Sequence, residues 1–261
     1  MAFSLFGPNI KKMREKKDVA GLIKILKGTP NIKTLSEAII ALAQMGKPAI
    51  EPIFQALRSA PTDGSFKNMP QMFIFCGNVV ATLCFLGMGT GEITIEYFLR
   101  ILKDKSENVE VRRPVAMALG YIAQERFIDP LIEILNDKKE SFFIRAGALR
   151  ALEKMQDVIG RAEFILGTLK RAQNVADKRF LDRVSSNPLF RGSDRILVAL
   201  IEALKDEDAA IRSSAAESLG EIATEKAYTP LKKLAKEDSE YFVRKSAEEA
   251  MAKIQKVKEN D

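Results

Sequence analysis

The strongest constraint on the fold is a two-helix pattern that recurs along the chain, and its clearest copy spans residues 107–137. In this copy, apolar and alanine residues recur at helical spacing from Val111 to Ile122, and a second apolar series runs from Phe127 to Leu135. Neither helix can bury its apolar face alone, so several copies have to stack against one another. The sequence therefore predicts an elongated array of helix pairs.

Other stretches repeat both helices of this pattern. Copies of the first helix carry a branched apolar residue and an arginine, then alanines and a glycine that allow close helix packing, as in residues 211–220. Copies of the second helix carry Pro52, Pro130 or Pro230, which we expect in the first turn, where the missing N–H of proline would have no partner in any case. We expect about seven units and about 13 helices in a single domain spanning residues 1–261.

One long irregularity divides the regular pattern. Residues 1–17 are predicted to form an N-terminal cap, residues 18–171 a first run of repeats, and residues 196–261 the last repeats and a C-terminal cap. Between them, residues 172–195 lack the alanine–glycine signature, and Pro188 would break a helix there. We expect this segment to be either a decayed repeat or a place where the array carries an individual function, since loops often do.

Two shorter features remain open at this level. Residues 61–70 are rich in proline, glycine and polar residues and are predicted to form a loop. At the N-terminus, Phe3 and Phe6 precede a basic run at residues 11–17. These two aromatic residues either cover the first repeat as part of the cap or contact a membrane surface beside the basic residues.

An arginine recurs at one position of the first helix and follows an aspartate by six to eight residues. The four aspartate–arginine pairs are Asp104 and Arg112, Asp137 and Arg145, Asp206 and Arg212, and Asp238 and Arg244. Because the same charges return in successive units, we expect them to join the units in a structural ladder. A binding or catalytic site would instead be expected at one place in the array.

The composition excludes several classes of catalytic site. The chain contains no histidine, the side chain that titrates near neutral pH without help, so a triad, a general base or a metal site that uses histidine is ruled out. No glycine-rich phosphate loop, zinc-ligand spacing or nucleophile elbow occurs. We therefore predict a chain that is not an enzyme and that has no catalytic residues, no metal site and no cofactor.

The location of the protein is predicted from what its sequence lacks. No window of 18 apolar residues occurs, so we expect no transmembrane helix. The first residues lack the order of charged and apolar segments that marks a signal peptide. Cys76 and Cys84 are eight residues apart on one expected helix, which is too far for a disulfide between them. These observations favour a cytoplasmic protein.

The pattern as a whole resembles HEAT repeats, and most closely the short HEAT-like repeats of the phycobilisome-lyase type. An apolar residue and arginine, alanines, leucine–glycine and a later aspartate–proline–leucine turn carry the resemblance. It is strong at residues 107–137 and 207–254, weaker at 30–104 and absent at 172–195. The resemblance implies an all-α, right-handed α-solenoid whose second helices line a concave face. It also implies binding far more often than catalysis.

Catalytic relatives of this family can be compared with the residues present. Deoxyhypusine hydroxylases hold iron through histidine–glutamate motifs, and the alkylpurine DNA glycosylases of this fold use tryptophans in a basic groove. The chain has neither histidine nor tryptophan, so neither activity is expected. A role as a tetrapyrrole–protein lyase or chaperone stays open, and it rests on the family resemblance alone.

The residue after the last core leucine or alanine of each second helix is basic in five of six copies. Packed about 8–10 Å apart, such helices would place these residues in a basic ridge that could follow a phosphate backbone. Alternatively, these cations only complement the negative end of each helix dipole. The basic residues at this position are Lys27, Arg58, Lys103, Lys205 and Lys236, and Asn136 is the exception.

The irregular segment supplies a second candidate surface. Its cations outnumber its carboxylates, and Phe180 and Phe190 lie among them. This composition suits a binding loop, although a solvated remnant of a repeat would look the same. The basic residues are Lys178, Arg179, Arg183, Arg191 and Arg195.

Together these observations favour a non-catalytic scaffold or adaptor that binds a protein of unknown identity through its concave face. The net charge of +6 also allows an anionic partner. The alternative is therefore a protein that binds nucleic acid or another anionic polymer through the basic ridge.

Overall fold

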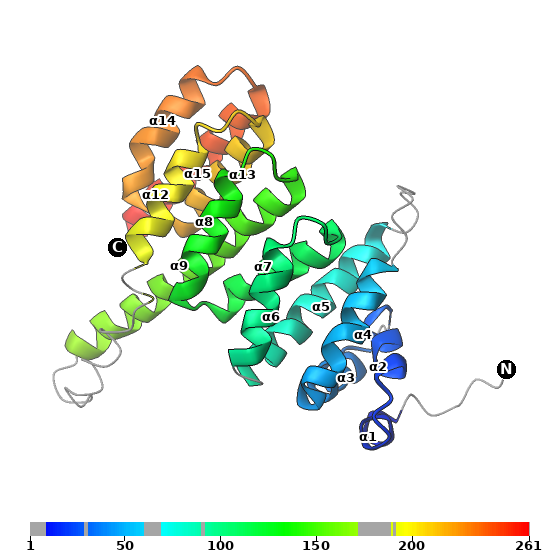
Figure 1. The fold of residues 1–261 in the computed structure, drawn as a ribbon. Coiled ribbons are helices and arrows are strands. Elements are labelled where there is room, and N and C mark those ends of the chain that lie inside the picture. The colour runs from blue at the N-terminus through cyan, green and yellow to red at the C-terminus, as the bar shows by residue number, and fades with distance from the viewer. Residues whose placement is uncertain are drawn as a thin grey trace. The chain divides into compact units, whose positions relative to one another are not determined.

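The computed structural model describes residues 9–28, 31–59, 69–89, 92–171, 189 and 192–260. Every regular element in these stretches is a helix: they hold 13 α-helices, two short 3-10 helices and no strand (Figure 1). This confirms the predicted all-α fold of successive helix pairs. The positions of Phe3, Phe6, residues 61–68 and most of the segment 172–195 lie outside the described residues.

The chain forms two compact units, residues 1–118 (unit 1) and residues 119–261 (unit 2). In unit 1 the first helices contact one another in order, α1 with α3 and α3 with α5, and the second helix α2 contacts α4 (Figure 1). Helix α7 (Val109–Ile122) begins in unit 1, and its last residues belong to unit 2. The first helices of unit 1 are α1 (Ile10–Glu15), α3 (Ile32–Met45) and α5 (Met69–Gly89). Its second helices are α2 (Val19–Leu26), α4 (Lys47–Arg58) and α6 (Glu92–Lys103).

Local sequence signals set the ends of the helices in unit 1. The side chains of Asn9, Asp18 and Asn31 each accept a hydrogen bond from a backbone N–H in the first turn of the helix that follows. Gly46 joins α3 directly to α4 with φ of 66°, a conformation that glycine adopts more easily than other residues. Pro48 then lies in the first turn of α4, whereas Pro52, which the sequence pattern placed in the first turn, lies inside the helix.

Unit 2 repeats the arrangement with short 3-10 turns. Turn η1 (Glu125–Phe127) leads into α8, and η2 (Glu225–Ala227) joins α13 to α14. The first helices pack in succession, α9 against α13 and α13 against α15, while α14 packs on α15. The remaining bounds are α8 (Ile128–Asn136), α9 (Phe142–Arg171), α12 (Ser193–Ala203), α13 (Ala209–Ile222), α14 (Tyr228–Glu237) and α15 (Tyr241–Asn260).

Helix α9 differs from the expected pattern. In the repeat pattern a first helix is followed by a separate second helix, which would fall at residues 163–171 here, but α9 continues without a break for 30 residues. No proline interrupts this stretch, and none of its three glycines, Gly147, Gly160 and Gly167, ends the helix. Helix α12 contacts α8, α9 and α13, and therefore takes the place of the missing second helix. The last residues of the segment 172–195 belong to α12, which begins at Ser193.

Small residues set the spacing of the first helices in unit 2. A methyl group added at Gly120 would lie 2.5 Å from the Cα atom of Ala151. The same addition at Gly220 would lie 2.7 Å from the Cα atom of Ala250. Both distances are far below van der Waals contact, so the backbones approach as closely as the alanine–glycine signature predicted.

The recurring arginines of unit 2 join successive layers. Arg145 donates to the carbonyl oxygen of Leu135 at 2.9 Å, and its guanidinium pairs with the Asp206 carboxylate. Arg212 donates to both carboxylate oxygens of Asp238, at 2.6 and 3.0 Å, and to the carbonyl oxygen of Asp206 at 2.8 Å. Each arginine thus bonds the end of the preceding second helix and an aspartate of the next layer, as expected for a structural ladder.

No helix among the described residues combines the length and the apolar character that crossing a membrane requires.

Candidate binding groove between second helices

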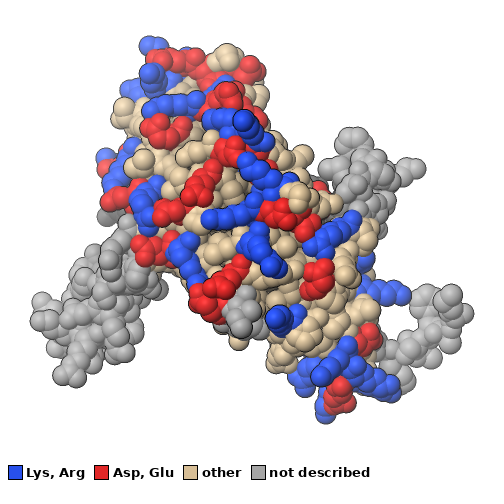
Figure 2. All heavy atoms as spheres, viewed as in Figure 1, with Lys and Arg blue, Asp and Glu red and all other residues tan. Residues whose placement is uncertain are grey.

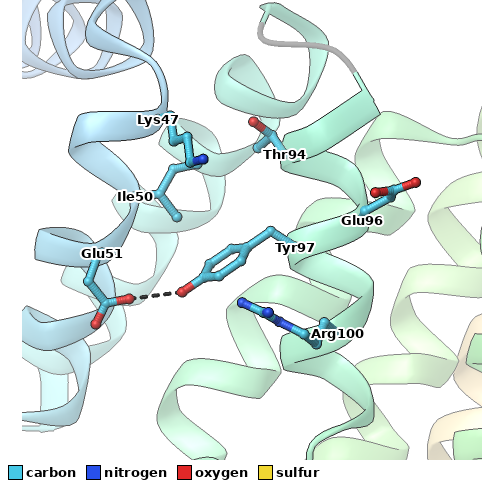
Figure 3. Close-up of a pocket in the computed structure, with 7 residues that line it drawn as sticks. All are labelled: Lys47, Ile50, Glu51, Thr94, Glu96, Tyr97 and Arg100. Carbon is cyan, nitrogen blue, oxygen red and sulfur yellow. Dashed lines mark hydrogen bonds between the residues drawn. The ribbon is translucent and has the colours of Figure 1, made fainter.

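The second helices α4 and α6 of unit 1 enclose a groove of about 460 Å³ (Figure 3). Helix α4 contributes one wall through Lys47, Ile50 and Glu51. Helix α6 contributes the other wall through Thr94, Glu96, Tyr97 and Arg100. The volume lies in the range of protein ligand pockets, so the groove can accept a side chain or a small group of atoms.

Stacked aromatic rings hold Tyr97 in place at the base of the groove. The ring of buried Phe54 stacks on that of Tyr97, with centroids 5.9 Å apart and an angle of 17° between the planes. Phe54 also meets Phe98 edge to face at 6.3 Å. The hydroxyl of Tyr97 donates to Glu51 at 2.8 Å (Figure 3). A rigid aromatic side chain with one polar end is a common element of binding surfaces.

Two exposed cations project into the groove from opposite walls. Figure 3 shows Lys47 reaching from α4 and Arg100 reaching from α6 toward the space between them. The guanidinium carbon of Arg100 lies 4.8 Å from the centroid of the Tyr97 ring, within the range of a cation–π contact. In the same view, Glu96 points away from α4. The groove therefore combines an aromatic base with a positively charged rim.

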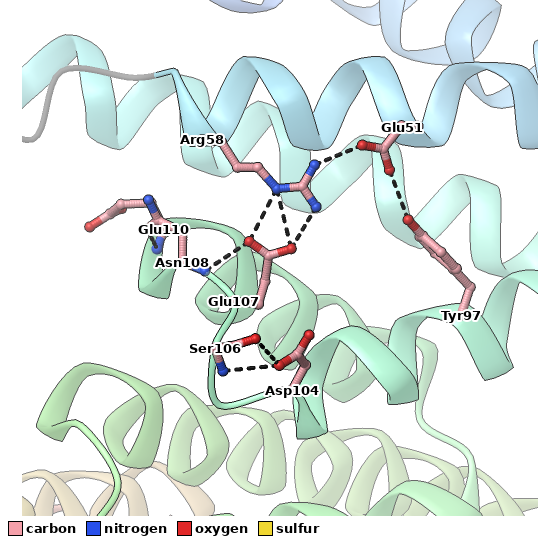
Figure 4. A network of polar contacts seen from close by, with 8 residues as sticks. All are labelled: Glu51, Arg58, Tyr97, Asp104, Ser106, Glu107, Asn108 and Glu110. Carbon is pink, nitrogen blue, oxygen red and sulfur yellow. Dashed lines mark hydrogen bonds and ion pairs between the residues drawn. The ribbon is translucent and has the colours of Figure 1, made fainter.

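Arg58 belongs to a polar network beside this groove (Figure 4). Its Nε donates to Glu107 Oε1 at 3.1 Å, and its terminal nitrogens donate to Glu107 Oε2 at 2.5 Å and to Glu51 Oε1 at 2.7 Å. The hydrogen bonds from Arg58 hold the pKa of Glu107 below its usual value, and those to Glu107 and Glu51 raise the pKa of Arg58. Two carboxylates thus compensate the charge of Arg58.

The polar network also includes the turn that follows the C-terminal end of α6. Asp104 follows the last residue of this helix and accepts hydrogen bonds from Ser106, at 2.6 Å from its hydroxyl and at 2.9 Å from its backbone N–H (Figure 4). These hydrogen bonds lower the pKa of Asp104. The turn after α6 is therefore held in a fixed conformation that presents Glu107 to Arg58.

The other cations predicted for the basic ridge differ in their surroundings. Lys103 and Lys236 are exposed at the ends of α6 and α14. Lys27, at the end of α2, lies with its Nζ atom 5.5 Å from the centroid of the Phe75 ring. Lys205, which follows the end of α12, donates to Glu202 of that helix at 2.9 Å. The basic position therefore has different surroundings from one repeat to the next.

Only one cation of the irregular segment falls within the described residues. Arg195 donates to Asp129 at 2.6 Å and to Glu125 at 3.2 Å, so it ties α12 to α8 and to the turn before it. Over the face shown in Figure 2, basic and acidic side chains are interleaved. The candidates Lys178, Arg179, Arg183 and Arg191 lie outside the described residues.

A comparable groove lies between second helices of unit 2. It occupies about 390 Å³ between α12 and α14, and Ile201, Leu204, Pro230 and Leu234 form its apolar part. Lys233 also lines it. Grooves between successive second helices therefore occur in both units, but none of the described residues that line this one is aromatic.

The groove residues were not predicted from the sequence, although the sequence contains a signal for one of them. Tyr97 stands five residues before Leu102, the last core leucine of its helix. At the same position the other second helices have proline, glycine or alanine, namely Pro52, Pro130, Pro230, Gly21 and Ala199. A large aromatic residue at a position otherwise filled by small or cyclic residues marks a local departure from the repeat.

The helix pairs that carry these grooves can be compared with known protein families. A family model of HEAT repeats matches residues 95–172 and 190–252, which is more than half of the chain. The chain belongs to the HEAT-repeat family. This match confirms the resemblance found in the sequence, and it includes α6 with Tyr97 and Arg100.

Solved structures are similar to this HEAT-repeat protein at low sequence identity. One is the complex of CpcE and CpcF of phycocyanin lyase from Nostoc sp. PCC7120, with 17% sequence identity, a TM-score of 0.50, and coverage of 78% of this chain and 98% of that chain. Human deoxyhypusine hydroxylase in complex with glycerol matches with 17% identity and a TM-score of 0.33, covering 95% of this chain and 100% of that chain. A comparison with curated proteins finds no match.

Among the described residues of this HEAT-repeat protein, no group of three or more cysteine, aspartate or glutamate side chains is placed to hold a metal ion. Cys76 and Cys84 are both buried and free. Burial raises the pKa of both thiols, that of Cys84 to about 12. A protonated, buried thiol is a poor nucleophile, so both residues contribute to packing.

Proposed function

We propose that this HEAT-repeat protein is a non-catalytic scaffold that binds a partner protein through its second helices. The groove between α4 and α6 is its principal contact. The observation that carries the proposal is the position of Tyr97, a half-buried aromatic side chain held by Phe54 and Glu51 at the base of an open groove. Aromatic anchors of this kind dominate the energetics of protein interfaces.

The form of the groove supports a protein as the partner. It is open to solvent along two helices, and its apolar lining consists of Ile50 and the Tyr97 ring with charged residues around them. An apolar centre with a polar rim is the usual anatomy of a protein interface. The second groove, between α12 and α14, offers a further contact for the same or another partner.

Binding of an anionic polymer is the less favoured alternative, because two cations of the predicted basic ridge are paired with carboxylates. Arg58 is paired with Glu107 and Glu51, and Lys205 is paired with Glu202. A cation already paired with a carboxylate contributes little to attracting a phosphate backbone, because the two charges cancel at short range.

Comparative capture from extracts of the native cells tests the proposal. Tagged wild-type protein, Tyr97→Ala and Tyr241→Ala are used as baits, and the bound proteins are quantified by mass spectrometry. Tyr241 is an exposed tyrosine on α15 outside both grooves, so its substitution is the same chemical change at a different place. Thermal unfolding confirms that each bait is folded.

We expect a set of proteins that wild type and Tyr241→Ala retain and Tyr97→Ala loses. Each such protein is then purified, and its binding is measured by calorimetry. Identical sets for all three folded baits would contradict the proposal. So would turnover or a bound cofactor in the purified protein.

A further inference from the structure

The charged side chains of the groove between α4 and α6, and not only its aromatic base, constrain the chemistry of its ligand. Lys47 and Arg100 enter it from opposite walls, and both are exposed (Figure 3). A ligand that fills the groove would therefore meet one cation on each wall. The remaining charges of the groove decide whether this positive charge is available to a ligand.

The two carboxylates of the groove leave the cations available. Glu51 accepts a hydrogen bond from Tyr97 at 2.8 Å and forms an ion pair with Arg58 at 2.7 Å. Its charge is therefore directed at two partners on the side of the groove that carries the network of Figure 4. Glu96, the second carboxylate, points away from α4 (Figure 3). Lys47 and Arg100 therefore remain available to a ligand in the groove.

Further cations continue this charge along the second helices of unit 1. Lys24 is exposed on α2, Lys27 at its end, and Lys103 at the end of α6. A ligand with several negative charges along its length complements these positions better than a single terminal carboxylate does.

We propose that this groove recognises an acidic segment of a partner protein. Carboxylates of the segment pair with Lys47 and Arg100 on the two walls, and an adjacent apolar side chain packs against Ile50 and the Tyr97 ring. This inference rests on the proposed protein-binding function and names the chemistry of the partner. The specificity comes from the pairing of an acidic residue with an apolar neighbour, because the groove presents a charged rim and an apolar base side by side.

The state of Tyr97 favours a peptide over a nucleic acid. Proteins that bind single strands stack bases on the faces of exposed aromatic rings. The ring of Tyr97 already stacks on Phe54 and lies against the guanidinium of Arg100. Its edge remains for contact with an apolar side chain, whereas a base would have to displace one of these neighbours.

Selection from a library of random peptides, displayed on phage and presented to the full chain, tests the inference. We expect the enriched peptides to contain aspartate or glutamate next to leucine, methionine or phenylalanine. One enriched peptide is then labelled with fluorescein, and its affinity is measured by anisotropy at increasing sodium chloride. The affinity should fall as salt rises, because exposed charges are screened.

Charge reversal within the groove gives the decisive comparison. The double variant Lys47→Glu and Arg100→Glu should bind the labelled peptide at least about tenfold more weakly. The matched control, Lys33→Glu on α3 and Lys232→Glu on α14, makes the same change in net charge outside the groove and should bind as wild type does. Circular dichroism checks that both variants are folded.

The outcomes separate the inference from the proposed function. Peptides that lack an acidic bias and depend on Tyr97 but not on Lys47 and Arg100 would overturn the inference and leave protein binding in place. If no enriched peptide depends on any groove residue, both ideas fail for this groove. Heparin or single-stranded DNA that binds as tightly as the peptide, and depends on the same two cations, would overturn the inference in favour of an anionic polymer.

Discussion

Arg58 and Glu107 lie 49 positions apart in the sequence, and the guanidinium of Arg58 donates to both carboxylate oxygens of Glu107. A planar guanidinium and a carboxylate that meet in this way form one of the strongest side-chain contacts in proteins. The pair joins the end of α4 to the turn that precedes α7 (Figure 4). It therefore holds two successive repeats of unit 1 in register.

Replacing Arg58 by alanine should lower the free energy of unfolding by about 1–3 kcal/mol, because Glu107 would keep its charge and lose its partner. The Glu107 side chain is only 10% exposed, so water cannot fully replace the guanidinium. Urea unfolding measures the change. Lys103→Ala removes an exposed cation at the same repeat position and should change the free energy of unfolding by less than about 0.5 kcal/mol. Equal losses in the two variants would contradict the role given to the pair.

Stability should depend on pH through Asp206 in unit 2. Burial alone would raise the pKa of Asp206, but hydrogen bonds from Arg145 and Lys138 hold it below its ordinary value of 3.8. A carboxyl with a depressed pKa in the folded state stabilises the fold above its unfolded pKa, and this contribution is lost as pH falls through the folded value. We therefore expect the free energy of unfolding to decrease as pH drops below 3.8.

Unfolding of wild type and Asp206→Asn in a series of buffers from neutral to acid checks this dependence. The asparagine variant should be less stable at neutral pH, because Arg145 would be buried without a charged partner. Its stability should also vary less across the acid range. Parallel pH curves for the two proteins would show that Asp206 does not contribute to the dependence.

The close packing of first helices predicts opposite effects of the same substitution at two glycines. Gly120→Ala should destabilise the protein by about 1–3 kcal/mol, because its methyl group would overlap the backbone of Ala151. Gly160→Ala places a methyl group in open space in the middle of α9 and should stabilise by about 0.5–1 kcal/mol through helix propensity. Thermal unfolding distinguishes the two, and a shift of the same sign in both would refute the packing argument.

A buried carboxylate joins α9 to α13. Glu153 is fully buried and accepts hydrogen bonds from Ser218 and Arg150, both at 2.6 Å, and it pairs with Lys154 at 2.9 Å. Glu153→Gln removes the charge but keeps the shape, and should lower the free energy of unfolding by about 1–3 kcal/mol.

The matched control for this change is Glu248→Gln on the exposed side of α15. It should have an effect below about 0.5 kcal/mol in the same chemical denaturation experiment. A loss at residue 153 no greater than that at residue 248 would mean that the buried network adds nothing to stability.

Much of the fold could be predicted because its determinants repeat. The apolar spacing set the helices, the glycines at positions 120 and 220 set the close contacts, and the arginines at positions 145 and 212 set the bonds between layers. Each of these signals occurs at least twice in the sequence, so a chance pattern could be recognised and discarded. The structure has the close helix contacts and the arginine bonds between layers that these signals predict.

The features that depart from the repeat were harder to predict from the sequence, and each has a physical reason. The continuation of α9 past residue 163 depends on the absence of a helix-breaking residue, which is a weaker signal than the presence of one. The role of Arg58 could not be seen from its repeat position, because its partner Glu107 is distant in sequence. The groove around Tyr97 arises where one second helix has a tyrosine at a position that is small or cyclic in the other second helices. A single exception of this kind is visible only when the repeats are aligned with one another.

The contacts of Gly120 and Gly220 have a consequence for how such a chain can change over time. These glycines, which lack the methyl group of alanine, set the distance between adjacent first helices. The chemistry offered to a ligand is set elsewhere, by residues such as Tyr97 on the second helices. Affinity for a new ligand can therefore be acquired by substitution on one set of helices while the framework on the other set is inherited unchanged.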